Sequence, residues 1–496
     1  MKKIILYSVL ILSGASLYGC KKFLETLPDN RIDLDNPANI TVDKVAELLV
    51  NAYPKANYMA FCESMSDNAE DKLGGSVTLS NYAPYEYVDV NNNMSQDMPS
   101  SYWTEAYKAV ALANQALTAI SKVSNPKDYS AQRGEALVTR AYAHFMLVNL
   151  FAKSYNPSTA SSDMGVPYVT APETTVFGQY DRKTVADTYN AIEQDLLEGL
   201  PLISDDAYTV PRYHFTKAAA NAFATRFYLY KKQYDKAVLY AGKVFPSGNF
   251  AANMRPWLTT YQKATYYDLQ LMYAAPTEKA NLLLVECMSN WGNNFPFYRF
   301  GLSSSILQTI YRKNVAGGGM AYLIYGTSLA LNIPKFYPHF VQTGLNANTG
   351  YYFNTIPLFT TEEVLLNRAE AYAYLGNYTA ALADLNTFAS QRVYNGLDSL
   401  GNMRPYDPVA NSITPASLTT YYSSSNTQSN IVNAVLDYKR AEFLFEGMRW
   451  FDVLRYNIQV THKYADSTTV LKPDDLRRVL QIPNAATLSG LPLNPR

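Results

Sequence analysis

Apolar and polar residues follow each other along most of this chain with the spacing of amphipathic helices. Apolar or alanine positions recur three and four residues apart, which places them on one helical face. This periodicity predicts helices at 41–53, 102–123, 131–152, 184–200, 216–231, 234–245, 361–375, 378–392 and 431–456. Runs with strand-like alternation are few and short, so the pattern predicts a mainly α protein.

Long segments without periodicity separate the predicted helices. They are rich in Asn, Ser, Pro, Gly and Tyr, and their aromatic content argues against disorder. Loops of this length are uncommon in compact domains unless they have a function, so ligand contacts are expected there. The segments are 57–101, 154–182, 245–281, 289–354 and 394–429.

Two of the predicted helical hairpins repeat each other in sequence. Segment 226–237 aligns without gaps on segment 370–381, so that Tyr234 falls on Tyr378 and Ala237 on Ala381. A Tyr-x-x-Ala motif after a polar turn, with small residues on the first helix, is typical of tetratricopeptide hairpins. A fainter unit surrounds residues 139–142. Such units can form a concave surface for a partner or a plain scaffold, and we favour the scaffold.

The first residues have the order of a signal peptide. Two lysines follow Met1, an apolar run continues to Leu17, and small residues precede Cys20. The run is shorter than the roughly 20 apolar residues of a membrane span. Leu17-Tyr18-Gly19-Cys20 resembles a bacterial lipobox, although Tyr18 is large for its position. We therefore expect residues 1–19 to be removed and Cys20 to carry the lipid; the alternative is an ordinary secreted protein.

Composition narrows the classes of function. The formal net charge is zero, which offers no basic surface for nucleic acid. Cys62 and Cys287 are the remaining cysteines, and two distant thiols are expected to be buried separately rather than paired. Tyrosine is unusually frequent, with 42 residues against 21 phenylalanines. Tyrosine suits hydroxyl-rich ligands, but most of these rings are expected to pack between helices.

The densest charged motif lies at 439–455. Glu442 and Glu446 are four residues apart on the predicted helix, and paired carboxylates can serve glycoside hydrolysis. Arg449, Asp452 and Arg455 follow at steps of three, which indicates a ladder of ion pairs along one helix. We favour the structural interpretation.

Signatures of other chemistry are missing from the sequence. The four histidines are widely spaced, and segment 67–71 is acidic but lacks the ordered spacing of a calcium loop. Gly317-Gly318-Gly319 is not followed by Lys-Ser or Lys-Thr, and no Gly-x-Ser-x-Gly occurs. We therefore expect no catalytic residues, no bound metal and no cofactor.

Several segments together resemble the RagB/SusD family of surface nutrient-binding lipoproteins from Bacteroidetes. The resemblance rests first on Arg440-Ala-Glu-Phe-Leu-Phe-Glu-Gly-Met-Arg-Trp-Phe-Asp-Val-Leu-Arg455. It also rests on the two hairpins and on four shorter segments along the chain. These are Cys20-Lys-Lys-Phe-Leu-Glu25 with Pro28, Arg140-Ala-Tyr-Ala-His-Phe145, Gly165-Val-Pro-Tyr168, and Ile482-Pro483 with Asn494-Pro495.

The resemblance implies a SusD-like fold in one domain spanning residues 20–496, with halves of about 20–230 and 231–496. Tetratricopeptide-like hairpins would form the scaffold and the long irregular loops the binding face. It further implies a lipid-anchored protein, exposed on the cell surface at the outer membrane. Such a protein binds glycan, or in some members peptide, without cleaving it and passes it to a SusC-like TonB-dependent transporter. A tetratricopeptide-type adhesion or assembly lipoprotein is the alternative from another class.

Candidate ligand residues follow from the physics of sugar recognition rather than from the resemblance. A sugar ring has an apolar face that stacks on aromatic planes, and hydroxyls that bond to amides and carboxylates. Two loop segments have this composition. The candidates are Asp67, Asn68, Tyr82, Tyr85, Trp291, Asn293 and Asn294.

Overall fold

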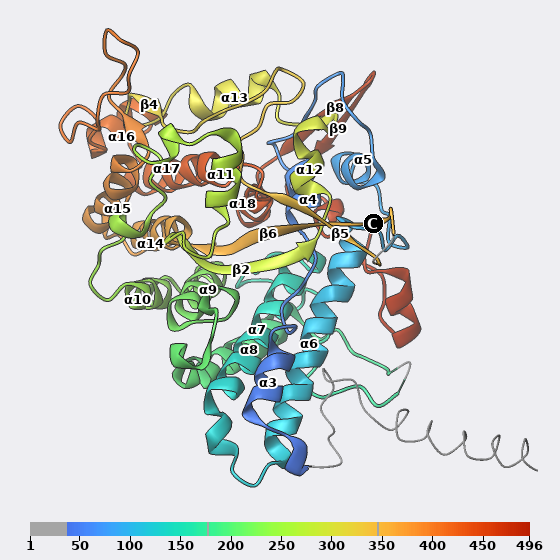
Figure 1. Cartoon of the computed structure of the whole chain (residues 1–496). Helices are drawn as coiled ribbons and strands as arrows, with labels where there is room; N and C mark the ends of the chain where they lie inside the picture. Colours follow the sequence, from blue (N-terminus) through green and yellow to red (C-terminus); the bar gives the residue numbers. More distant parts are fainter. Residues whose placement is uncertain (1–36, 176–177, 345–346) are drawn as a thin grey trace, which may run out of the picture.

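The structure is a computed structural model that describes residues 37–175, 178–344 and 347–496. It is mainly α-helical, as the periodicity predicts (Figure 1). Over these residues, no helix combines the length and the apolar character that crossing a membrane requires. The predicted signal peptide and Cys20 lie outside the described residues.

The helices fall close to the predicted segments, and shorter ones occur within the long loops. They are α3 (Val42–Leu49), α4 (Met59–Met65), α5 (Leu79–Tyr85), α6 (Pro99–Lys122), α7 (Ser130–Phe151), α8 (Val185–Gly199), α9 (Lys217–Tyr230), α10 (Tyr234–Val244), α11 (Tyr266–Tyr273), α12 (Trp291–Asn294), α13 (Ser304–Tyr311), α14 (Thr361–Tyr374), α15 (Tyr378–Ser390), α16 (Pro415–Tyr422), α17 (Thr427–Glu442) and α18 (Met448–Arg455).

The two repeated hairpins are α9–α10 and α14–α15, and they pack side by side (Figure 1). Ala237 and Ala381, the small residues of the shared motif, are fully buried where the helices of each hairpin approach. Tyr234 of one hairpin stacks on Tyr374 of the other, with ring centroids 4.4 Å apart. The α7–α8 pair extends the stack on one side and α17 on the other.

A three-stranded antiparallel sheet crosses the molecule above α9 in Figure 1, in the order β2-β6-β5. Strand β2 is a short apolar run, of which Leu282 to Val285 are buried, and such a run cannot be distinguished from a buried helix by periodicity. The strands are β1 (Glu70–Asp71), β2 (Asn281–Met288), β3 (Phe300–Gly301), β4 (Gly319–Met320), β5 (Pro338–Gln342), β6 (Gly350–Thr360), β7 (Val393–Tyr394), β8 (Val460–Tyr464) and β9 (Ser467–Leu471).

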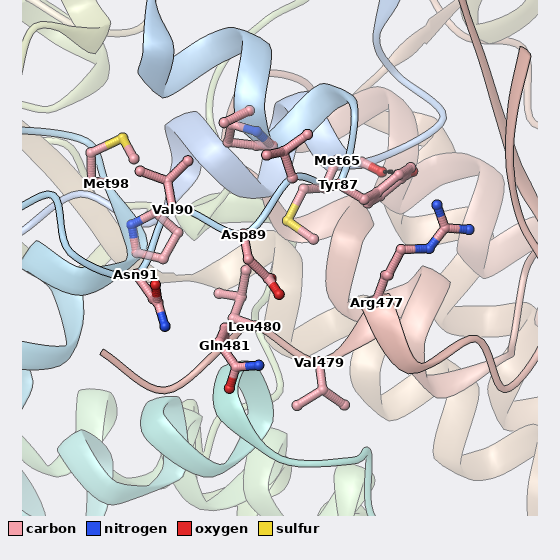
Figure 2. Close-up of a pocket in the computed structure, with 14 residues that line it drawn as sticks. Met65, Tyr87, Asp89, Val90, Asn91, Met98, Arg477, Val479, Leu480 and Gln481 are labelled. Carbon is pink, nitrogen blue, oxygen red and sulfur yellow. Dashed lines mark hydrogen bonds between the residues drawn. The ribbon is translucent and has the colours of Figure 1, made fainter. Parts of the chain in front are cut away.

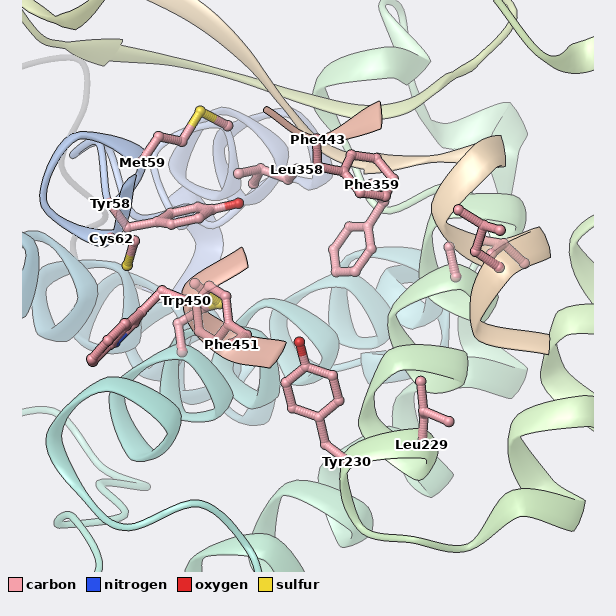
Figure 3. Packing of buried hydrophobic residues seen from close by; sticks show 14 of the residues in the cluster. Tyr58, Met59, Cys62, Leu229, Tyr230, Leu358, Phe359, Phe443, Trp450 and Phe451 are labelled. Carbon is pink, nitrogen blue, oxygen red and sulfur yellow. The ribbon is translucent and has the colours of Figure 1, made fainter. Parts of the chain in front are cut away.

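One large apolar core joins segments from both ends of the described chain. Figure 3 shows Tyr58, Met59 and Cys62 of the α4 region packed near Trp450 and Phe451 of α18. Tyr58 meets Phe451 edge to face, with centroids 5.8 Å apart. Cys62 and Cys287 are both buried and unpaired, which confirms the expectation of separate thiols.

The single helix predicted at 431–456 is wrong. The chain leaves α17 after Glu442 and enters α18 at Met448, and Phe445 and Gly447 in between have φ angles of 72° and 69°. A side chain at position 447 would bring Cβ to 2.8 Å from the Met59 Cα, so α4 packs directly against this turn. Tertiary packing thus breaks the helix at Gly447, although the apolar periodicity continues past it.

The ion-pair ladder predicted along that helix is also wrong, apart from one step. Arg455 contacts Asp452 at 3.1 Å, but Glu442 binds Arg392 at 2.6 Å and Glu446 binds Lys335 at 2.7 Å. The break changes the direction of the chain, so these carboxylates meet cations from distant segments. Both are buried and paired with bases, in keeping with structural use.

Candidate functional site

The two loop segments that sequence reasoning selected lie side by side, to the right in Figure 1 near α5 and α12. Strand β1 pairs with β3, with Asp71 opposite Phe300. The Ser76 amide donates to the Phe297 carbonyl at 2.8 Å, and the Arg299 amide donates to the Ser76 carbonyl at 2.9 Å. We call this surface, residues 66–82 and 289–301 with residue 329, the loop face.

Two side chains clamp the loop face together. The Asn81 amide donates to the Phe300 carbonyl at 2.7 Å and accepts from the Phe300 N–H at 3.1 Å, like a strand partner. The Lys72 ammonium donates to the carbonyls of Pro296 at 2.9 Å and Leu329 at 2.7 Å. Burial lowers the pKa of Lys72 to about 8. These bonds join segments that are distant in sequence and hold the loops in one arrangement.

Asp67 and Asn68 tie the loop face to the C-terminal block. Asp67 binds Arg449 through two bonds of 2.7 and 2.9 Å, and Asn68 accepts from Arg440 at 2.8 Å. Burial opposes ionisation of Asp67, but Arg449 and Arg440 hold the pKa of its carboxyl below the ordinary value. The polar groups of both residues are therefore occupied by the protein itself.

Tyr85 and Trp291 lie inside the protein. Tyr85 is stacked between Phe300 and His462, at centroid distances of 4.4 and 4.0 Å, and its hydroxyl donates to the Lys463 carbonyl. Trp291 is 4% exposed, and its indole N–H donates to the Phe445 carbonyl at 3.0 Å. In this arrangement both rings anchor loops and present no face to a ligand.

Tyr82, Asn293 and Asn294 are half-buried, so each keeps some surface on the loop face. Tyr82 leans on Phe300 and on Tyr464, at 5.9 and 5.5 Å between centroids. The Asn293 amide donates to Asn294 at 3.0 Å, which aligns two amides at the end of α12. These three remain candidate ligand residues.

Phe297 is the aromatic residue that sequence reasoning missed. It follows α12 by three residues and is 57% exposed, whereas Phe295 and Tyr298 beside it are buried. The aromatic cluster 295–298 is visible in the sequence, but the exposed ring is decided by the local turn. The loop face therefore presents a flat apolar ring and two side-chain amides within five residues of each other.

Two buried carboxylates, those of Glu63 and Asp97, accept hydrogen bonds from turns next to the loop face. Glu63 accepts from the amides of Phe445 and Gly447 at 2.9 and 3.0 Å, and burial raises its pKa to about 7. Asp97 accepts from the Ser289 hydroxyl at 2.6 Å and the Asn290 amide at 2.9 Å, and burial raises its pKa to about 6. Both hold a turn by bonding its backbone or hydroxyl donors.

A pocket of about 450 Å³, open in part to solvent, lies between the segment after α5 and the C-terminal segment. Figure 2 shows Tyr87 and Arg477 near each other on the right, Asn91 on the left, and Asp89 and Gln481 between them. Asp89 is bound by Arg496, at 2.6 Å. We place the candidate site on the loop face, where aromatic and amide groups are exposed together.

Both aspartates of the acidic segment 67–71 are paired with arginines. Asp71 binds Arg299 through bonds of 2.7 and 2.9 Å, and Asp67 binds Arg449. Across residues 37–175, 178–344 and 347–496, no group of three or more His, Cys, Asp or Glu side chains could hold a metal ion. The chemistry that the loop face offers is ring stacking and hydrogen bonding.

Curated relatives align with this chain over most of its length. SusD-like protein P38 of Formosa agariphila is 22% identical, over 92% of this chain and 92% of its own. SusD-like protein P2 of the same organism is 22% identical, over 75% of this chain and 74% of its own.

Solved structures share the fold. A SusD superfamily protein from Bacteroides thetaiotaomicron superposes with a TM-score of 0.66 and 20% identity, over 92% of this chain and 100% of its own. A SusD-like carbohydrate binding protein from Bacteroides vulgatus has a TM-score of 0.64 and 14% identity, over 90% and 96%. A laminarin binding SusD-like protein has a TM-score of 0.61 and 18% identity, over 91% and 99%.

Two family models match the chain. One, described as starch-binding associating with outer membrane, matches residues 22–229, and the other, described as the SusD family, matches residues 333–477. The second match includes the hairpin α14–α15 and the C-terminal block on which the resemblance rests. Together these two matches cover most of the chain, and they show that it belongs to the SusD/RagB family.

Proposed function

We propose that this protein is a cell-surface nutrient-binding lipoprotein that captures an oligosaccharide and delivers it to a TonB-dependent transporter, without cleaving it. The observation that carries the proposal is the loop face, where the exposed ring of Phe297 lies close in sequence to the amides of Asn293 and Asn294. Support also comes from the relatives, one of which is described as carbohydrate binding and another as laminarin binding.

The loop face has the composition that saccharide recognition requires. The flat ring of Phe297 can cover the apolar face of a sugar, and side-chain amides can donate to and accept from hydroxyls. The clamps at Asn81 and Lys72 hold these groups in place before a ligand arrives, which lowers the entropy lost on binding. A rigid, partly aromatic surface of this kind is suited to binding a saccharide rather than to cleaving it.

The anchor belongs to the same proposal. We infer that residues 1–19 are removed and that acylated Cys20 holds a single domain of residues 20–496 at the outer membrane. Several acyl chains on one residue give stable attachment, so the protein would stay beside its transporter while ligands exchange. Mass spectrometry of the N-terminal peptide from membranes tests the acylation directly.

The experiment compares the full-length protein in detergent with two alanine variants. Calorimetric titration with neutral oligosaccharides should show binding, and chromatography should show no product. Phe297→Ala should weaken affinity about tenfold or more, because stacking on one ring contributes on the order of 1–3 kcal/mol. Tyr421→Ala, which removes an exposed ring on α16, is the matched control and should bind like the unchanged protein.

Equal affinities for both variants would reject the loop face as the site. Binding of a peptide pool but not of a glycan pool would replace the oligosaccharide by a peptide and keep the uptake role. Co-purification from membranes with a barrel transporter is expected, and recovery of a different partner instead would favour an adhesion or assembly role.

A further inference from the structure

A second polar cleft lies on the scaffold, away from the loop face. Two adjoining hollows of about 750 and 980 Å³, both open to solvent, share Ser154, Tyr155, Lys232, Arg455 and Asn457 in their linings. They lie between the loop after α7, the α9–α10 turn and the end of α18. We call them together the tyrosine cleft, because half-buried tyrosines form much of one wall: Tyr155, Tyr234, Tyr374 and Tyr456.

The turn that carries Lys232 is unusual. In the alignment of the two hairpins, Lys232 falls on Gly376, and both have left-handed backbones with φ angles of 60° and 73°. Glycine adopts this conformation without steric cost, whereas for lysine the Cβ atom makes it unfavourable. Because glycine serves the same turn in the second hairpin, the turn itself does not require the side chain of Lys232.

The charge of Lys232 is not matched by the protein. Lys232 is exposed, and among the described residues no carboxylate forms an ion pair with its ammonium. Partial burial of the ammonium, together with the neighbouring Arg455, lowers its pKa. Arg455 itself is bound by Glu370 and Asp452. The cleft therefore contains one ammonium group that lacks a counter-charge.

Two of the three acidic side chains that line the tyrosine cleft form ion pairs, and the third, Asp474, bonds only to a neutral amide. Asp163 binds Lys153 at 2.8 Å, Asp475 binds Arg477 at 2.7 Å, and Asp474 accepts from the Asn457 amide at 3.3 Å. Tyr456 donates its hydroxyl to Glu370 at 2.7 Å. The cleft thus combines the ammonium of Lys232 with aromatic rings, a set that suits a sugar bearing an anionic group.

We propose that the tyrosine cleft binds an acidic segment of a saccharide, with the Lys232 ammonium contacting a carboxylate or sulfate group and the tyrosine rings lining the sugar. The inference rests on the proposed function, because it assigns a second contact for the same class of ligand. It makes the scaffold a binding surface as well as a support.

Three probes test the proposal on the full-length protein in detergent: an oligogalacturonate, a sulfated carrageenan oligosaccharide and neutral maltoheptaose. Acetylation of Lys232, followed by peptide mass spectrometry, should slow about fivefold or more with an acidic probe and stay unchanged with maltoheptaose. Lys236, which is bound by Glu193, is the internal reference. Protection by one acidic probe alone identifies carboxylate or sulfate as the recognised group.

Variants of Lys232 separate binding from folding. Lys232→Gly places at this turn the residue that the other hairpin uses, so it should fold and yet bind the protecting probe about tenfold more weakly. Lys232→Arg should keep the affinity, because it keeps the charge. Phe297→Ala should leave the protection of Lys232 unchanged, so failure of the loop face and failure of the cleft give different results. Absence of protection by both acidic probes, or unchanged affinity in Lys232→Gly, would overturn the inference.

Discussion

Single residues determine where the C-terminal block turns. At Gly447 the backbone has φ of 69°, and a methyl group there would approach the Met59 Cα to 2.8 Å and the Cys62 Cβ to 2.9 Å. Neither neighbour can move cheaply, because both belong to buried α4. The apolar periodicity of the sequence continues through Gly447, and the requirement for glycine depends on an element nearly 400 residues away.

We expect Gly447→Ala to lower the free energy of unfolding by about 3 kcal/mol or more, through strain and overpacking together. Gly376→Ala is the matched control, because φ is also positive, at 73°, but no atom lies within 4 Å of the added Cβ. It should cost only about 1 kcal/mol. Denaturant unfolding followed by circular dichroism measures both, and equal losses would show that packing against α4 is unimportant.

Glu63 predicts a pH dependence of stability. Its pKa rises from an ordinary 4.5 to about 7 on folding, so the folded protein binds more protons than the unfolded chain between these values. The stability contributed by this group is complete below pH 4.5 and is lost as pH rises to about 7. Relative to Glu63→Gln, which does not titrate, the unchanged protein should lose about 3 kcal/mol across this range. Parallel stability curves for the two proteins would contradict the assignment.

At the scale of elements, buried ion pairs join helices that the sequence leaves far apart. Arg392, at the end of the α15 hairpin, binds Glu442 of α17 at 2.6 Å and Glu362 of α14 at 2.7 Å, and all three side chains are fully buried. An intact buried ion pair adds little net stability, because desolvation offsets the attraction. Removal of one partner is strongly destabilising, because it leaves the other charge buried without a counter-charge. These pairs therefore fix how the helices dock.

Glu442→Gln should lower the free energy of unfolding by about 3–5 kcal/mol, because it leaves Arg392 buried with only part of its charge matched. Glu198→Gln serves as the control, since it breaks an exposed pair with Arg133 on the surface of α8. The control should change stability by less than about 1 kcal/mol. Similar losses in both variants would show that burial does not determine the cost.

The repeated hairpins were predictable from the sequence and the sheet was not. A helix pair is specified by local periodicity and by the Tyr-x-x-Ala motif, so segments 226–237 and 370–381 could be recognised and aligned. Strand β2 pairs with β6, which lies more than 60 residues further along the chain. Pairing between distant segments leaves little local pattern, and the buried face of β2 looks like any short apolar run.

For the whole molecule, family membership was predictable and the exposed surface of the site was not. The signature at 440–455, the hairpins and the N-terminal segment together indicate the family, which the family models confirm. Composition also selected the two loops that form the loop face. Composition could not distinguish Tyr82, which is partly exposed, from Tyr85, which is buried between Phe300 and His462.

The sequence by itself determined the helical scaffold, because periodicity and small-residue motifs act within a few residues of each other. The tertiary structure decided which side chains of the loops bond within the protein and which stay exposed to a ligand. Asp67 is bound by Arg449, and Trp291 donates to the Phe445 carbonyl, across separations of 382 and 154 residues. Contacts over such distances depend on the path of the chain through space, which explains why Phe297 and Lys232 became visible as candidates only in the folded protein.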